Sequence, residues 1–247
     1  YRPIIDAAKS LNKKSRFDHF SKNKKITLGL LRKIKQRNIA IINDNKKYFA
    51  PKSVNELKRI FKQEPNSKLI SGGTDVSLIV TKERKDLNSL IYMNSINELN
   101  YIKENNSYVE VGATTPLINF ESFITKYFPD FSQILKRYGS VQIRNVCTIA
   151  GNIATASPIG DTLPLLLALD SQIVIKDKNK TQILPLNGFF ISYRKTKLKK
   201  GQFIHSIRIP LLKKNIFKAY KISKRIDDDI SSVCASFNIE INNNKIK

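Results

Sequence analysis

The sequence predicts an α+β fold, because short apolar runs typical of strands are mixed with helical patterns and no long strand-helix-strand repeat is present. Residues 231–240 alternate apolar and polar positions, as a half-buried strand does, whereas residues 54–61 repeat apolar positions at helical spacing. A chain of 247 residues with 41% hydrophobic content can bury a sizeable core. We therefore expect one large domain or two modest ones.

The N-terminal residues 1–45 are the least regular part. YRPIIDAAKSL begins as though in the middle of a helix, and the Lys-rich stretch that follows is typical of a polar connector, so we interpret these residues as a linker. After it, Ser53 can cap a helix. The apolar face of that helix contains Val54, Leu57, Ile60 and Phe61.

The central elements follow from turn residues and apolar runs. KLISGGTDVSLIV, residues 68–80, predicts a strand, a tight turn, and then either a strand or the start of a helix. The apolar run SLIYMNSI, residues 89–96, is followed by a polar tip. In YVEVGATTPLINF, Val109 and Val111 alternate as in a strand, and a helix is expected from about Pro116.

The second half of the chain continues this mixture. SQILKRYGS predicts a helix that ends near Gly139, and LPLLLALDSQIVIKD predicts a buried helix that leads into a strand. Further strands are expected at KTQILPL and FIHSIRIP. Two alternating segments, residues 216–222 and 231–240, precede a hairpin tip at Asn242 to Asn244 and predict a second module that this sequence does not finish.

Composition limits the possible functions. The net charge of +24 comes mainly from Lys residues scattered along the whole chain, which favours amino-acid usage over a dedicated binding surface. The alternative, a basic nucleic-acid-binding module, predicts salt-sensitive affinity for DNA or RNA, but clustered Arg, stacked aromatic residues and recognition-helix motifs are absent. Cys147 and Cys234 have no partners at metal-ligand spacing, so no metal site is expected. Because no apolar run could span a bilayer, we expect a cytoplasmic protein without a membrane partner.

SGGTD, residues 71–75, is the first candidate for a binding site. Consecutive glycines allow backbone N–H groups to converge on one point, and the Thr hydroxyl adds a donor, as in a nest for a diphosphate. The stretch is not a P-loop, and the dinucleotide fingerprint GxGxxG is absent from the chain. A tight turn between two strands would use the same residues, so this alternative stays open.

TIAGNIATASPIGDTLP, residues 148–164, is the second candidate because it carries one formal charge in a strongly basic chain. Gly151 and Asn152 belong to a set of small residues that let backbone approach a ligand closely, where Lys or Arg would fill the space. A small-residue segment for helix packing is the alternative, but Pro158 and Gly160 interrupt a helix and leave Asp161 at the end of a loop. Upstream, Tyr138 could lay its ring on a planar ligand, although such an aromatic residue is more often part of a core.

KISKRIDDDI, residues 221–230, places three adjacent carboxylates beside Lys221 and Arg225. Charged clusters of this kind are usually solvated surfaces. His19 and His205 stand alone in the sequence, and neither receives a catalytic role. No Ser/His/Asp or Cys/His arrangement is indicated.

Taken together and in this order, KLISGGTDVSL, VGATTPL, the block from RYGSVQIRN to SQIVI, FFISYRKT and FKAYKISKRIDDDI resemble the FAD-binding domain of the xanthine dehydrogenase family of molybdenum hydroxylases. The resemblance covers roughly residues 48–247. It implies an FAD-binding PCMH-type fold, similar to vanillyl-alcohol oxidase, with two α/β subdomains, followed by the start of a CO dehydrogenase flavoprotein C-terminal-like domain. The corresponding divisions are residues 1–45 as the tail of an iron-sulfur domain plus linker, 46–213 as the FAD-binding domain, and 214–247 as a truncated C-terminal domain.

The resemblance also implies roles for individual residues. The segment that cradles FAD corresponds to Lys68, Leu69, Ile70, Ser71, Gly72, Gly73, Thr74, Asp75 and Val76. Asp75 stands where some members carry Glu, which shortens its reach toward the flavin. Tyr138 corresponds to an aromatic residue that stacks on the isoalloxazine, Thr148 and Asp161 to polar FAD contacts, Ile204 to an apolar neighbour of the ring, and Lys221 to a basic FAD contact. Arg225 and Asp228 correspond to charged residues that tune the flavin, and Tyr193 to a residue near the nicotinamide site.

The implied function is electron transfer through FAD. In the family, electrons leave a purine-like substrate at a molybdenum cofactor in a partner subunit, pass through iron-sulfur clusters and FAD, and reach NAD+. The alternative is the flavin subunit of a related aldehyde, carbon monoxide or aromatic acyl-CoA hydroxylase; a cell-wall precursor reductase of similar fold is more distant. His19 and His205 lie outside the loops that carry covalent links, so non-covalent FAD is expected, and Cys147 keeps the question open. All of this requires residues 71–75 and 148–161 to line one cavity.

Overall fold

The computed structural model describes residues 2–11, 19–35, 37–211, 215–243 and 245–246, and these form two units that divide after residue 37. The first unit contains α1 (Arg2–Leu11) and α2 (His19–Lys33). Residues 19–33 are therefore helical where the sequence predicts a connector, because Lys, Leu and Arg have good helix propensity even without an apolar face. Within the described residues, no helix is both long enough and apolar enough to cross a membrane.

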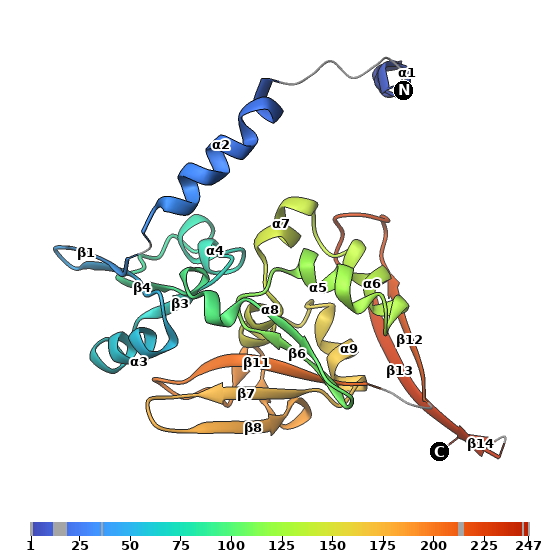
Figure 1. Ribbon diagram of the computed structural model, residues 1–247. Helices are drawn as coiled ribbons and strands as arrows, with labels where there is room; N and C mark the ends of the chain where they lie inside the picture. Colours follow the sequence, from blue (N-terminus) through green and yellow to red (C-terminus); the bar gives the residue numbers. More distant parts are fainter. Residues whose placement is uncertain (1, 12–18, 36, 212–214, 244, 247) are drawn as a thin grey trace. The chain divides into compact units, whose positions relative to one another are not determined.

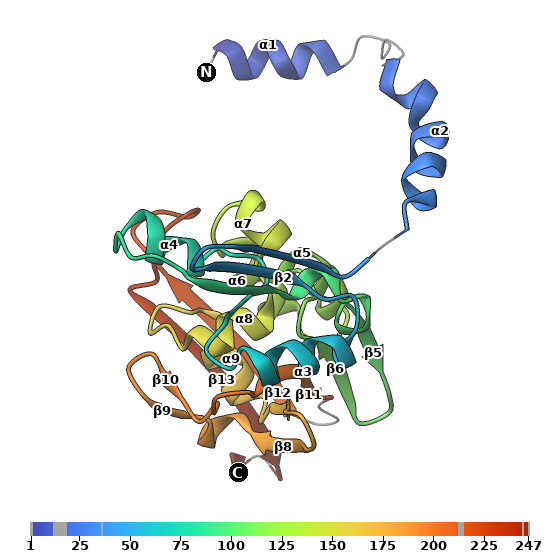
Figure 2. The ribbon, with the colours of Figure 1, turned by 90° about the vertical axis from the view of Figure 1, so that its left-hand side faces the viewer.

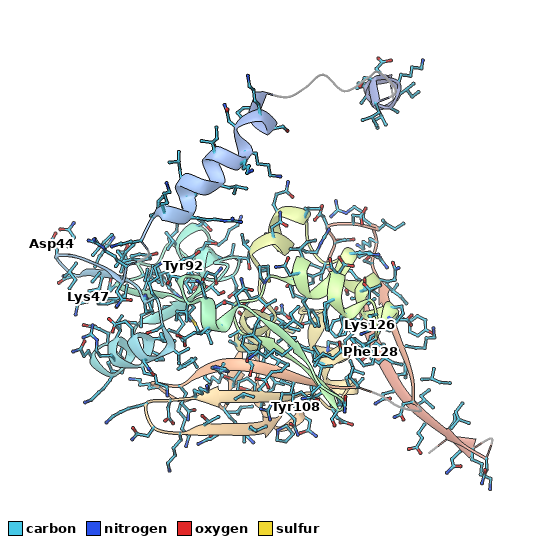
Figure 3. The ribbon with its side chains drawn as sticks, viewed as in Figure 1. Asp44, Lys47, Tyr92, Tyr108, Lys126 and Phe128 are labelled. Carbon is cyan, nitrogen blue, oxygen red and sulfur yellow. The ribbon has the colours of Figure 1, made fainter. Side chains whose placement is uncertain are left out.

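The second unit has the predicted α+β composition and begins with a four-stranded sheet (Figure 1). The strand order is β1 (Ile39–Asn43), β2 (Lys46–Ala50), β4 (Ser89–Tyr92) and β3 (Lys68–Ile70). Strands β1 and β2 form an antiparallel hairpin with Asp44 at its tip (Figure 3), whereas β2, β4 and β3 run parallel. Strand β1 lies within residues 1–45, where the sequence predicts a linker.

Helix α3 (Val54–Gln63) packs on this sheet and confirms the predicted cap. The Ser53 hydroxyl accepts a hydrogen bond from the Glu56 amide at 3.1 Å, which satisfies one free donor of the first turn. The four apolar residues of its predicted face are buried in a small core. That core also contains Ile91 of β4 and Phe203 of the five-stranded sheet described next, so it joins these two sheets.

A five-stranded antiparallel sheet forms the centre of the unit. Its order is β5 (Ile102–Glu104), β6 (Tyr108–Gly112), β11 (Phe203–Pro210), β7 (Gln172–Lys176) and β8 (Thr181–Pro185). The larger core lies between one face of this sheet and helices α5 (Leu117–Ile124), α6 (Pro129–Lys136), α8 (Ile149–Thr155) and α9 (Thr162–Ala168). Short 3-10 turns occupy residues 93–95, 97–99 and 186–188.

The C-terminal strands β12 (Asn215–Ile222) and β13 (Val233–Asn242) form the long hairpin that the two alternating segments predict. Strand β14 (Lys245–Ile246) pairs with the end of β13, while Asn244 of the predicted tip lies outside the described residues. Helix α6 contacts β12 and α9 contacts β13 (Figure 1). The ring of Phe128, which is labelled in Figure 3, meets the ring of Phe217 on β12 edge to face at 5.4 Å. This contact joins the hairpin to the larger core.

Candidate functional site

A cavity of about 1100 Å³ lies in the second unit, at the segments that the sequence singles out. Residues 71–75, the small-residue segment from Thr148 to Asp161, and parts of residues 221–230 all contribute to its wall. The predicted convergence of the two glycine-bearing turns is therefore confirmed.

The first wall is the turn between β3 and α4 (Val76–Thr81). Gly73 has φ +72°, a left-handed conformation that costs glycine little. A Cβ atom on Gly72 would lie 2.0 Å from the carbonyl oxygen of Val146, so the backbone of this turn touches the chain two residues before Thr148. Within the described part of the chain, the amides of Gly72, Gly73 and Thr74 donate no hydrogen bond to another protein group, and they line the cavity. They are available to an anionic ligand.

The second wall consists of α7 (Val141–Val146), α8 and the turn that follows α8. The Thr148 hydroxyl accepts a hydrogen bond from the Gly151 amide at 3.2 Å and begins α8. Ala156 ends the helix in a left-handed conformation with φ 48°. A Cβ atom on Gly160 would lie 3.1 Å from both Asn152 Oδ1 and the Ser157 carbonyl oxygen. Small residues are therefore required by packing and leave open space on the cavity side.

Tyr138 connects this wall to the larger core. Its ring packs against the core and also lines the cavity, so the two alternatives for this aromatic residue are compatible. Asn152 Nδ2 donates to the Tyr138 hydroxyl at 2.8 Å, and the Thr162 hydroxyl donates to Asn152 Oδ1. Burial raises the pKa of Tyr138, and the neighbouring Cys147 and Asp161 add to this effect, so the phenol stays neutral.

The third wall contains a buried ion pair that joins the C-terminal hairpin to the end of the small-residue segment. Lys221 Nζ on β12 lies 2.6 Å from Asp161 Oδ2, and both side chains line the cavity. The Ser231 hydroxyl donates to Asp161 Oδ1 at 2.5 Å. Asp161 therefore joins the small-residue segment to both ends of the loop between β12 and β13.

Both cysteines are poor nucleophiles in this structure. Burial raises the pKa of Cys147, which lines the cavity, and burial together with Asp161 raises the pKa of Cys234 to about 12. Both thiols are therefore protonated at neutral pH. Among the described residues there is no cluster of three or more His, Cys, Asp or Glu side chains that could hold a metal ion.

Several charged side chains also line the cavity. Asp75 Oδ1 lies 3.4 Å from Arg194 Nη1, which follows Tyr193 in the turn between β9 (Phe190–Ser192) and β10 (Lys195–Thr196). This short hairpin projects from the edge of the unit (Figure 2). Tyr193 lines the cavity with its side chain largely exposed, and Lys68 and Asp228 also lie at the wall.

Most of the residues selected from the sequence meet at this cavity. They are Lys68, Leu69, Ser71, Gly72, Gly73, Thr74, Asp75, Val76, Tyr138, Thr148, Gly151, Asn152, Asp161, Tyr193, Lys221 and Asp228. Three others do not line it. Ile70 lies on β3, Ile204 is buried in the larger core, and Arg225 is exposed with its guanidinium 3.5 Å from Asp229. The side chain of His19 lies outside the described residues.

The sequence reasoning missed four residues that shape the site. Ser231 and Thr162 hydrogen-bond Asp161 and Asn152, Arg194 pairs with Asp75, and Arg137 holds the segment after Lys221. Each partner except Thr162, which is ten positions from Asn152, is at least 70 positions away in sequence. The only local signal is the position of Arg137 directly before Tyr138.

Comparison with known proteins gives one family and consistent relatives. Residues 42–212 match the family model described as the FAD binding domain in molybdopterin dehydrogenase. The chain is 34% identical over 218 residues to a xanthine dehydrogenase of Emericella nidulans, covering 83% of this chain and 16% of that protein. It is 31% identical over 210 residues to nicotinate hydroxylase hnxS of the same organism, covering 77% of this chain and 16% of that protein. The chain thus spans less than a fifth of these curated relatives.

Solved structures support the same fold. A chain of carbon monoxide dehydrogenase from Hydrogenophaga pseudoflava aligns with TM-score 0.77 and 26% identity, covering 84% of this chain and 73% of that chain. A chain of quinoline 2-oxidoreductase from Pseudomonas putida 86 aligns with TM-score 0.74 over 81% of this chain and 70% of that chain, and its 19% identity shows the fold alone. The predicted FAD-binding PCMH-type fold is confirmed.

Proposed function

This chain belongs to the family of FAD-binding domains of molybdopterin dehydrogenases, and from that premise we propose that its 1100 Å³ cavity binds one FAD molecule non-covalently. The observation that carries the proposal is that the two glycine-bearing segments line one cavity, with the Gly72 backbone packed against Val146 just before the second segment. The volume of about 1100 Å³ lies just above the roughly 300–1,000 Å³ common for ligand pockets, as expected for a dinucleotide.

The turn at residues 71–75 would hold the diphosphate. Its free amides at Gly72, Gly73 and Thr74 can donate directed hydrogen bonds to phosphate oxygens. The Thr148 hydroxyl uses its oxygen to cap α8, so its proton is free to serve as a further donor. Uncharged donors of fixed position select a bound geometry, which mobile Lys side chains would not. This explains why residues 148–164 carry a single charge.

Lys221 would place a positive charge beside the bound cofactor. Its ammonium has three N–H donors, and among the described residues it donates one hydrogen bond, to Asp161. The remaining donors can face a ligand, while the carboxylate offsets the charge and fixes the Lys side chain. Asp161 thus acts on the cofactor partly through Lys221, in addition to the direct contact that the resemblance implies.

Tyr138 would contact the flavin through its ring. Asn152 holds the hydroxyl in place, and the raised pKa keeps the phenol neutral, so no charge is placed against the ring system. The protonated Cys147 thiol agrees with a non-covalent cofactor, since a covalent link would need a reactive thiolate.

We further propose that the chain is the FAD-binding, electron-transfer part of a xanthine dehydrogenase-like oxidoreductase. FAD, when bound, supplies the redox chemistry that connects iron-sulfur clusters with NAD+. Tyr193 and the carboxylate of Asp228 at the cavity wall support access for a nicotinamide there. The purine-like substrate would react at a molybdenum cofactor in a partner subunit, and an aldehyde, carbon monoxide or aromatic acyl-CoA hydroxylase is the alternative assignment.

The division of the chain also stays a proposal. Residues 1–45 would be the tail of an iron-sulfur domain plus a linker, 46–213 the FAD-binding domain, and 214–247 the start of a C-terminal flavoprotein domain. The 213/214 boundary lies outside the described residues. Because Asp161 and Lys221 come from either side of this boundary, the C-terminal hairpin contributes directly to the proposed site.

An absorbance spectrum of the purified protein, after incubation with FAD and removal of the excess, tests the proposal. We expect the two flavin bands at a flavin-to-protein ratio near one, with all flavin released by acid precipitation. A colourless protein would refute FAD binding, and flavin that stays with the precipitate would refute the non-covalent mode.

A further inference from the structure

Arg137 connects the cavity wall to the loop between β12 and β13. Its guanidinium donates three hydrogen bonds: Nε to the Ile226 carbonyl oxygen at 2.9 Å, Nη1 to the Lys221 carbonyl oxygen at 2.8 Å, and Nη2 to the Ser223 hydroxyl at 2.9 Å. Resting on the proposed function, we propose that Arg137 is a positioning residue that holds residues 221–230, the acidic loop, against the flavin cavity.

The chemistry of the contact requires arginine. A guanidinium presents donors in a rigid planar fork, and here the fork reaches acceptors at residues 221, 223 and 226. A Lys ammonium is a single point and cannot reproduce this spacing. The contact therefore fixes the beginning and the middle of the acidic loop at once.

Internal hydrogen bonds extend the effect to the rest of the loop. The Ser223 hydroxyl donates to the Arg225 carbonyl oxygen at 2.6 Å, and the Arg225 amide donates to Asp229 Oδ2 at 2.8 Å. These bonds fold the loop back on itself. By fixing residues 221–226, Arg137 thus also fixes the positions of Asp228 and Asp229. Both of these residues line the cavity.

The other attachments lie at the two ends of the loop. Lys221 and Ser231 both contact Asp161, at distances of 2.6 and 2.5 Å. Within the described residues, no other hydrogen bond or ion pair joins positions 222–230 to the body of the unit except those from Arg137. Arg137 itself does not line the cavity. Its effect on the cofactor must pass through the loop.

Hydrogen exchange of the whole chain, measured by mass spectrometry, tests the attachment without requiring FAD. In Arg137→Gln we expect the hydrogen-bonded amides of residues 222–232 to exchange at least about tenfold faster, because the loop loses its charge-assisted hydrogen bonds at residues 221, 223 and 226. Exchange in β6 and α9 should stay unchanged. Lys136→Gln removes the same charge one residue away and should leave the loop at the wild-type rate. Wild-type exchange of the loop in Arg137→Gln, or an equal increase in both variants, would overturn the proposal.

The effect on the cofactor is measured separately. With FAD bound, Arg137→Gln should shift the midpoint potential of the flavin and raise the FAD dissociation constant about tenfold, since the carboxylates of the loop move relative to the cavity. A loosened loop with unchanged potential and affinity would overturn the positioning role.

If Arg137→Gln does not fold, a second variant tests the same contact. Ser223→Ala removes one acceptor and should speed exchange of the same amides several-fold; an unchanged rate would refute the proposal. A wild-type protein that binds no FAD would refute the proposed function, and the exchange result alone would then decide the role of Arg137.

Discussion

Lys221 Nζ lies 2.6 Å from Asp161 Oδ2, and the two side chains are only 2% and 3% exposed. Sixty positions separate them in sequence, and the contact joins the C-terminal hairpin to the turn after α8. Removing two charges from water is costly, so a buried ion pair by itself contributes little net stability, whereas removing one partner is strongly destabilising. Here both groups line the proposed flavin cavity.

Asp161→Ala should therefore destabilise the protein and reduce FAD retention. Loss of one partner leaves the Lys221 charge buried and unpaired, which typically costs about 3–5 kcal/mol of unfolding free energy. Chemical denaturation and the flavin-to-protein ratio after gel filtration would measure the two effects. The double variant Asp161→Ala with Lys221→Met should recover part of the stability but not FAD binding. An unchanged flavin ratio in Asp161→Ala would contradict the assignment.

Gly72→Ala should abolish FAD binding while the rest of the unit stays folded. The added Cβ atom would lie 2.0 Å from the Val146 carbonyl oxygen, so the turn at residues 71–75 must move away from the end of α7 and its amides lose their alignment. Gly188→Ala is the matched control, because its Cβ would meet nothing closer than the Lys197 ammonium at 3.7 Å. Titration with FAD, followed by flavin fluorescence, would compare them. Equal affinities for the two variants would argue against a diphosphate site at this turn.

Tyr138→Phe should retain FAD, whereas Tyr138→Ala should lose it, because the ring and not the hydroxyl would contact the flavin. The Phe variant leaves Asn152 Nδ2 without its acceptor, so we expect a loss of about 1–3 kcal/mol in unfolding free energy. Denaturant melts and visible circular dichroism of the bound flavin would separate stability from binding. Full FAD affinity in Tyr138→Ala would show that the ring belongs to the core alone.

His205 should make the stability depend on pH between about 6.5 and 4. Burial, with a contribution from nearby Lys176, lowers the pKa of His205 from 6.5 to about 4. In this range the unfolded chain binds a proton at His205 and the folded chain does not, so the free energy of unfolding falls as the pH falls. At pH 8 the imidazole is neutral in both states and the effect is absent.

His205→Gln should flatten this part of the pH profile relative to the wild type. Carboxylates that do not interact with His205, such as Asp229, whose pKa is lowered by a hydrogen bond from the Arg225 amide, act alike in both proteins. Urea denaturation at half-unit steps from pH 8 to 4.5 would measure the difference. Parallel profiles would contradict the assignment of a buried neutral imidazole.

Local signals were sufficient for many elements of this fold. The cap at Ser53 and the apolar spacing of the following helix depend on residues within a few positions of each other, and α3 forms as predicted. The same holds for the Gly-Gly turn and for the absence of bulky charges in residues 148–164, because each reflects a steric need at its own position. The helix at residues 19–33 was not predicted within the linker, since its helix propensity is not accompanied by an apolar face.

The role that the resemblance implies for Ile204 depends on tertiary structure, which local patterns do not show. A shift in the pairing of β11 with β7 between Ile204 and Ser206 interrupts the alternation of faces, and Ile204 is buried in the larger core away from the cavity wall. Sequence alternation cannot reveal such an interruption, because it depends on the neighbouring strand.

The sequence by itself determined the fold class, the two glycine-bearing turns and about half of the residues that line the cavity. Only the tertiary structure decided which polar groups meet. Asp161 contacts Lys221 and Ser231, and Arg137 contacts the acidic loop, at separations of 60 to 89 positions in sequence. Conformational preference is a property of short segments and is visible in their residues. The pairing of distant charges depends on which surfaces the packed core brings together, and that is set by the whole chain at once.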